Sequence, residues 1–68
     1  MESVVIRVGG MSCQGCVRNV TGVLLAVPGV TSVEVSLEAG EARVEFDPAQ
    51  AGMAAFRSAI EDAGFDAE

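Results

Sequence analysis

Every second position along residues 3–8 is apolar, while Val5 and Arg7 fall on the other face. This period of two is typical of a β-strand with one buried face. The apolar positions of that face are Val4, Ile6 and Val8. Two glycines follow, Gly9 and Gly10, and they are expected to end the strand.

The period changes to that of a helix from about residue 14. Apolar residues then recur at spacings of three or four, as on the buried side of an α-helix. They are Val17, Val20, Leu24 and Val27. Pro28 and Gly29 come next, and this pair is a stop signal. We therefore predict a helix over residues 14–27 that begins at Cys13 and Cys16.

Alternation returns in two stretches, residues 33–37 and 42–46. Residues 38–40 form a short connection between them, so the pattern predicts a β-hairpin with one buried face. The apolar positions of the hairpin are Val33, Val35, Leu37, Ala42, Val44 and Phe46.

A second helix is expected to start at Asp47, whose carboxylate can cap free backbone N–H groups. Pro48 would take the first helical position, and Gln50 would reach back in the manner of a capping box. The apolar residues of its buried side are Met53, Phe56 and Ile60. The helix should end at about Ala63, because Gly64 follows.

Residues 65–68 leave room for only a short last strand. The element order is then βαββαβ, the split βαβ arrangement of ferredoxin-like folds. We predict an α+β sandwich in which a four-stranded antiparallel sheet carries both helices on one face. One domain is expected to span residues 1–68.

Composition and charge argue against several classes of function. Four Arg, no Lys and ten acidic residues give a net charge of −6, which repels nucleic-acid phosphates and anionic lipids. No apolar run approaches the roughly 20 residues that cross a bilayer, and residues 1–10 lack the features of a signal peptide. We expect a cytoplasmic protein. Without His, a catalytic triad or a phosphate-binding glycine loop, we do not expect an enzyme.

The candidate chemistry lies in Cys13-Gln14-Gly15-Cys16, at the predicted junction of strand and helix. Free N–H groups and the positive end of the helix dipole favour thiolate over thiol at such a junction. Thiolates prefer soft ions such as Cu(I), and two sulfurs suit an ion of low coordination number. Structural zinc usually takes four ligands, and the chain offers no His and no second cysteine pair.

Two other interpretations of the cysteine pair remain open. A Cys-x-x-Cys that opens a helix after a strand is also typical of thiol–disulfide oxidoreductases. Against this, Ser12 rather than an aromatic residue precedes Cys13, and Pro28 and Pro48 lie at helix boundaries rather than before a strand facing the thiols. The pair can also be inert and structural.

The motif Gly10-Met11-x-Cys13-x-x-Cys16, with βαββαβ patterning over all 68 residues, resembles the heavy-metal-associated domain family. The family includes small bacterial copper chaperones, the amino-terminal domains of copper-transporting P-type ATPases, and mercury-binding proteins. By that resemblance Cys13 and Cys16 are the metal ligands, Met11 points inward and braces the loop, and Phe65 packs beside the site.

The resemblance also implies a function. The domain would bind Cu(I) and transfer it by ligand exchange to a copper-transporting P-type ATPase or a related metal-binding domain. Hg(II), Cd(II) and Zn(II) use the same ligand types and stay open, as does the choice between a free chaperone and an ATPase domain. The protein would be a monomer, with a metal-bridged dimer as an alternative.

Two positions depart from the pattern of many bacterial chaperones. Gly15 stands where those proteins carry His, and Phe65 stands where they carry Tyr, so the late loop resembles that of an ATPase domain. The lysines that eukaryotic chaperones place near the metal are absent. Arg18 and the helix dipole would have to offset the charge of a two-thiolate Cu(I) centre.

Several residues have a simple structural interpretation beside the functional one. Met11 is more commonly core than a thioether ligand. Phe65 either packs or shields the ion from water, and Arg18 is either a solvated charge or a contact to an acidic partner. The acidic residues near the carboxyl end either aid solubility or steer a partner. They are Glu61, Asp62, Asp66 and Glu68.

Overall fold

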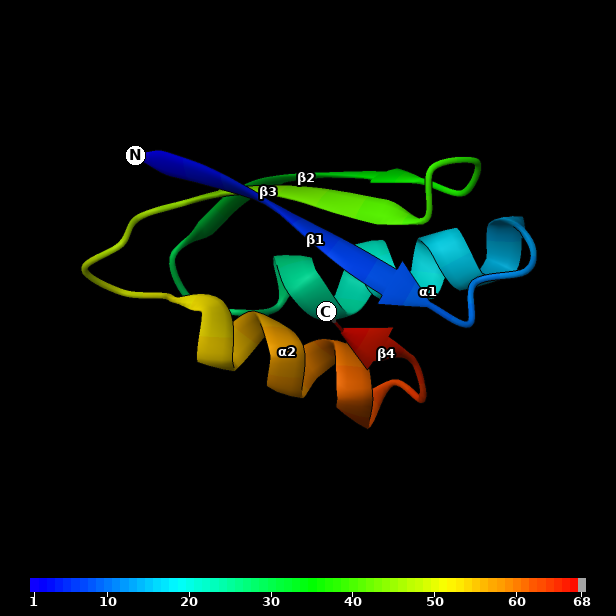
Figure 1. The fold of residues 1–68 in the computed structure, drawn as a ribbon. Coiled ribbons are helices and arrows are strands. Elements are labelled where there is room, and N and C mark those ends of the chain that lie inside the picture. Colours follow the sequence, from blue (N-terminus) through cyan, green and yellow to red (C-terminus); the bar gives the residue numbers. More distant parts are fainter. Residues whose placement is uncertain (68) are drawn as a thin grey trace.

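The computed structural model describes residues 1–67 and has two layers (Figure 1). The elements in chain order are β1 (Glu2–Gly9), α1 (Gln14–Leu25), β2 (Val30–Ser36), β3 (Glu41–Phe46), α2 (Met53–Asp62) and β4 (Asp66–Ala67). The strands form one antiparallel sheet in the order β2-β3-β1-β4. Both helices lie on the same side of it. The predicted βαββαβ order and ferredoxin-like sandwich are confirmed.

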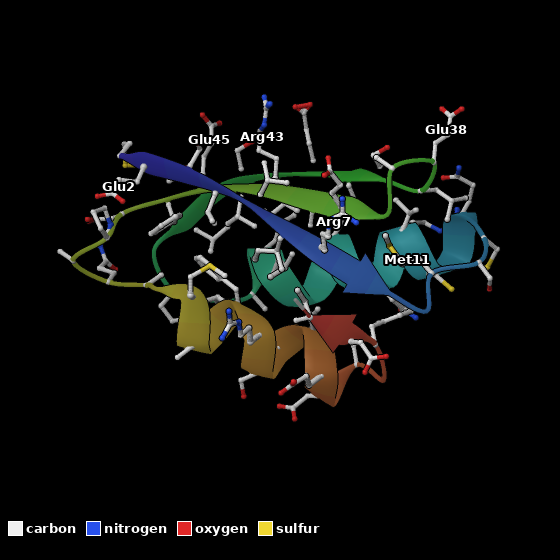
Figure 2. The ribbon with its side chains drawn as sticks, in the orientation of Figure 1. Glu2, Arg7, Met11, Glu38, Arg43 and Glu45 are labelled. Carbon is white, nitrogen blue, oxygen red and sulfur yellow. The ribbon has the colours of Figure 1, made fainter. Side chains whose placement is uncertain are left out.

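The centre of the sheet is the pair β1 and β3. It runs in register from Glu2 opposite Phe46 to Arg7 opposite Glu41. Figure 2 shows Arg43 and Glu45 of β3 pointing away from the helices, so alternate residues divide between an outer, solvated face and an inner face. The outer face of the sheet is therefore exposed to solvent, while the inner face packs against the helices.

The core consists of apolar side chains from the inner face of the sheet and from one side of each helix. These are Ile6, Val8, Val20, Leu24, Ala42, Val44, Phe46, Phe56 and Ile60. The rings of Phe46 and Phe56 meet edge to face, with centroids 4.9 Å apart and planes at 76°. No polar or charged side chain of residues 1–67 is buried, so apolar burial is the main stabilising term.

The predicted start of the second helix is wrong. α2 begins at Met53, and Asp47 instead closes a separate turn. Its carboxylate accepts the backbone N–H of Ala49 at 3.0 Å and the side-chain amide of Gln50 at 3.2 Å, and these bonds lower the pKa of Asp47. The turn does not continue as helix because Gly52 is extended, with φ −158° and ψ 179°, and serves as the N-cap of α2.

Other boundaries moved by a few residues. α1 ends at Leu25 rather than residue 27, and β2 runs over Val30–Ser36 rather than 33–37. A bulge between Val30 and Ser32 interrupts the pairing with β3, which explains why the start of β2 does not alternate. β4 covers two residues of the predicted last strand, and Glu68 lies outside the described residues. Neither helix of residues 1–67 is long and apolar enough to cross a bilayer.

A close backbone crossing connects the two halves of the fold at Gly29. The carbonyl of Gly29 accepts the N–H of Asp47 at 2.8 Å. Gly29 has φ +94°, and a Cβ built on it would lie 2.6 Å from the Cβ of Gln50. Neither the left-handed backbone nor the space suits a residue with a side chain.

Replacing this glycine tests the crossing. Gly29→Ala is expected to lower the free energy of unfolding by about 1–3 kcal/mol, because it adds backbone strain and a clash with Gln50. Gly22→Ala is the matched control in α1, where an added Cβ meets nothing within 4 Å. The control should be neutral or stabilising by up to about 1 kcal/mol. Urea denaturation measures both, and a Gly29→Ala protein as stable as the parent would contradict the prediction.

Candidate metal centre

The loop between β1 and α1 brings the two cysteines together. Gly10 turns the chain out of β1 with φ +94°. Cys13 is the N-cap of α1 in an extended conformation, with φ −158° and ψ 172°, and its carbonyl accepts the N–H of Cys16 at 3.0 Å. The two sulfurs lie 3.7 Å apart. The prediction that the first helix begins at the cysteines is confirmed.

The two thiols differ in their surroundings. Cys13 is exposed, whereas Cys16 is half-buried, and both are free. A backbone hydrogen bond from Ser12 is the main cause that lowers the pKa of Cys16, with a smaller contribution from the thiol of Cys13, while partial burial opposes them. Cys16 therefore becomes a thiolate more readily than an ordinary cysteine.

Ser12 contributes more than the sequence indicated. Its hydroxyl oxygen lies 3.9 Å from the sulfur of Cys16. In the sequence, Ser12 stands out only as a non-aromatic residue before Cys13. Its place four residues before Cys16 was the available signal, but hydroxyl residues are so common near helix N-termini that it points to no metal site by itself.

Gly10, Met11 and Phe65 come together around this loop. Met11 is half-buried and packs against the core, and Figure 2 shows it on the segment that joins β1 to α1. Phe65 is also half-buried against the core. A Cβ built on Gly10 would lie 3.7 Å from Cδ1 of Phe65, so the ring lies against the loop.

The charged residues singled out in the sequence lie on the surface. Arg18 is exposed on α1, two residues past the second cysteine. Glu61, Asp62 and Asp66 are exposed around the end of α2 and β4. Whether they contact a partner stays a prediction, and Glu68 lies outside the described residues.

In the part of the chain that the structure describes, the two sulfurs have no third His, Cys, Asp or Glu ligand beside them. Within residues 1–67, no group of three or more His, Cys, Asp or Glu side chains is arranged to hold a metal ion. A shallow hollow of about 290 Å³ lies on the outer face of the sheet, and neither cysteine lines it. The pair is thus an exposed two-sulfur site at a helix N-terminus rather than a multidentate cage in a cleft.

Known proteins are similar to this chain in sequence and in fold. The model of the heavy-metal-associated domain matches residues 5–66. The chain is 44% identical over 66 residues to the copper-transporting ATPase 1 of Mus musculus. This match covers 97% of the chain but only 4% of that ATPase. It is 42% identical over 66 residues to the copper chaperone CopZ of Staphylococcus saprophyticus, with 97% of both chains covered.

A solved structure agrees with these sequence matches. The copper-binding domain from HMA7, a P-type ATPase, superposes with a TM-score of 0.97 at 38% identity, covering 100% of this chain and 92% of that one. The family match over residues 5–66 includes most of β1, the cysteine loop and both helices. The chain therefore belongs to the heavy-metal-associated domain family.

Proposed function

We propose that this domain carries Cu(I) on the thiolates of Cys13 and Cys16 and passes it to a partner protein by ligand exchange. The observation that carries the proposal is the pair of free sulfurs 3.7 Å apart at the start of α1. A modest change in the side-chain torsions of Cys13 and Cys16 would let both sulfurs bind one ion from opposite sides. The names of two relatives, a copper chaperone and a copper-transporting ATPase, support copper as the cargo.

The limited donor set favours Cu(I) over Zn(II). Cu(I) is soft and is satisfied by few thiolates, whereas zinc in proteins takes four ligands. Residues 1–67 assemble no third His, Cys, Asp or Glu ligand around the pair. Zn(II) would need water or another protein molecule to complete its shell, and Hg(II) and Cd(II) remain chemically compatible competitors.

The local electrostatics would support the bound ion. Two thiolates and Cu(I) carry a net charge of −1, and the chain contains no Lys to offset it. The N–H groups at the start of α1 and the hydrogen bond from Ser12 to Cys16 place positive partial charge at the sulfurs. Arg18, one turn into the helix, adds the closest formal positive charge along the sequence.

The difference in exposure suggests how the ion would leave. A partner thiolate approaches from the solvent side, where Cys13 is exposed. It forms a new Cu–S bond, giving an intermediate with three sulfurs, and then one of the two local Cu–S bonds breaks. Copper stays Cu(I) throughout and no redox agent is needed. The partner would be a P-type ATPase or a related metal-binding domain, and transfer would take place in the cytoplasm.

Single serine substitutions test the two-thiolate site. Cys13→Ser and Cys16→Ser should each weaken Cu(I) binding by more than about 100-fold, because the loss of an outer-shell partner alone typically costs 10–100-fold. Competition against a chromophoric chelator under reducing conditions gives the affinities, and circular dichroism should show an unchanged fold, since neither cysteine is in the core. A single-serine variant that binds Cu(I) as tightly as the parent would rule out the two-thiolate site.

Met11→Leu separates packing from ligation. Leu keeps the apolar volume but removes the thioether, so Cu(I) affinity should stay within about threefold of the parent. X-ray absorption should report the same two Cu–S bonds in parent and variant. Met11 would instead be a ligand if the variant lost as much Cu(I) affinity as the cysteine variants do. The same would follow if the parent showed a third Cu–S bond that the variant lacks.

An insulin-reduction assay separates a metal carrier from a dithiol oxidoreductase. The metal-free, reduced domain is expected to give no turnover above the background of the reductant alone. The double variant Cys13→Ser/Cys16→Ser is the control for that background. Turnover that depends on the cysteines would move the assignment to thiol–disulfide chemistry.

A further inference from the structure

β1 carries an open edge. On one side it pairs with β3 from Glu2 to Arg7, but on the other side β4 pairs only with Val8 and Gly9. Within residues 1–67, the stretch 2–6 therefore has no strand on the β4 side. Figure 1 shows β4 beside only the carboxyl-terminal end of β1.

The backbone groups that face this edge can be identified from the ladder. The N–H of Val8 donates to the carbonyl of Gly40 at 2.8 Å, so the backbone of Val8 faces the β3 side. Successive residues of a strand alternate in direction, so Val4 faces β3 as well. Ser3 and Val5 consequently direct their N–H and C=O groups to the open edge.

Apart from Glu2 at its start, the open edge lacks the usual protection against strand pairing. Proteins guard edges with charges, prolines and bulges. β2, at the opposite edge, carries Glu34 and has a bulge between Val30 and Ser32. The stretch Ser-Val-Val-Ile at residues 3–6 has no charge, proline, glycine or bulge, and its Val5 side chain is 50% exposed.

We propose that two copies of this chain associate edge to edge through β1, in antiparallel pairing centred on Val4. Ser3 of each copy then lies opposite the second copy's Val5, and both residues have their backbone groups directed outward. Val4 faces its own symmetry mate, and Glu2 lies opposite the second copy's Ile6, so no like charges oppose each other. The two four-stranded sheets become one continuous sheet.

Neighbouring registers fit less well. Only registers that pair odd-numbered residues with odd-numbered residues let Ser3 and Val5 exchange hydrogen bonds. Centring on residue 5 would place the second copy's Glu2 opposite Val8, which β4 already holds. Centring on residue 3 would leave Val5 opposite Met1 at the end of the chain and shorten the ladder.

The association must be weak. A five-residue ladder buries far less than the roughly 1,200 Å² of a stable interface. Each copy also carries a net charge of −6, so the copies repel each other. The dimer should thus appear at protein concentrations of about 0.1–1 mM. Salt should strengthen it, because screening removes the repulsion.

Sedimentation equilibrium and amide NMR on the reduced protein, with metal removed by a chelator, test the proposal over 0.02–1 mM at low and high salt. We expect a reversible monomer–dimer equilibrium that tightens with salt, and concentration-dependent shifts at the amides of Ser3 and Val5. A protein that stays monomeric at 1 mM overturns the proposal. So do shifts centred on β2, or a dimer that forms only with metal or through a disulfide.

A proline at position 3 provides the sharpest variant. Ser3→Pro removes an N–H that the fold itself does not use, since it faces the open edge, and should weaken dimerisation at least tenfold. Ser3→Ala is the matched control, because it removes the same hydroxyl but keeps the N–H, and it should stay within twofold of the parent. Equal dimerisation of the two variants overturns the proposal. Should Ser3→Pro fold poorly, Val5→Lys puts a charge at the same edge and must weaken the dimer similarly.

Discussion

The apolar contact between the inner face of the sheet and one side of each helix determines where every functional group lies. Val20 and Leu24 of α1 are fully buried beneath the sheet, which fixes the rotation and direction of that helix. Its first turn is then held at the end of β1, where the free N–H groups of a helix start are available to the sulfurs. The core contains neither cysteine, so its apolar packing is made without the metal-binding side chains, unlike that of domains built around structural zinc.

That arrangement separates stability from chemistry. In a domain of this size only about 60% of the chain's surface can be buried, so there is little room for a deep pocket. An exposed thiol at a helix N-terminus needs none. Cys16 is half-buried and hydrogen-bonded to Ser12, so its sulfur is the more constrained of the two, while the side chain of Cys13 is exposed to solvent. An ion on such a pair is accessible to a second protein without any opening of the fold.

Residue periodicity was enough to predict the sandwich, because each element buries one face and the core is purely apolar. Predictions failed where a local signal had two outcomes. Asp47 and Gln50 do form the bonds of a capped turn, but only the extended Gly52 decides that no helix follows directly. The bulge at the start of β2 similarly breaks an alternation that depends on regular pairing.

The candidate site shows the same division. Its two cysteines stand out in the sequence, because a Cys-x-x-Cys pair in a chain without His has few functions besides binding a soft metal ion or thiol–disulfide exchange. The distance of 3.7 Å between their sulfurs does not follow from spacing, because it requires Cys13 to be an extended N-cap and Cys16 to be helical. The hydrogen bonding of Ser12 to Cys16 depends on the same loop geometry.

β1 ties the two surfaces of interest to one rigid element. Val4, at the centre of the open edge, precedes Gly10 by six residues, or about 20 Å of extended strand. Figure 1 places the amino terminus and the β1–α1 connection at opposite ends of the molecule. A second copy paired along residues 2–6 would therefore leave the cysteine loop free. Because β1 is held by β3 along Glu2–Arg7, neither surface has to deform for the other to be used. Association of copies and delivery of an ion are thus compatible in one molecule, whereas a dimer bridged by metal would occupy the sulfurs that the partner must reach.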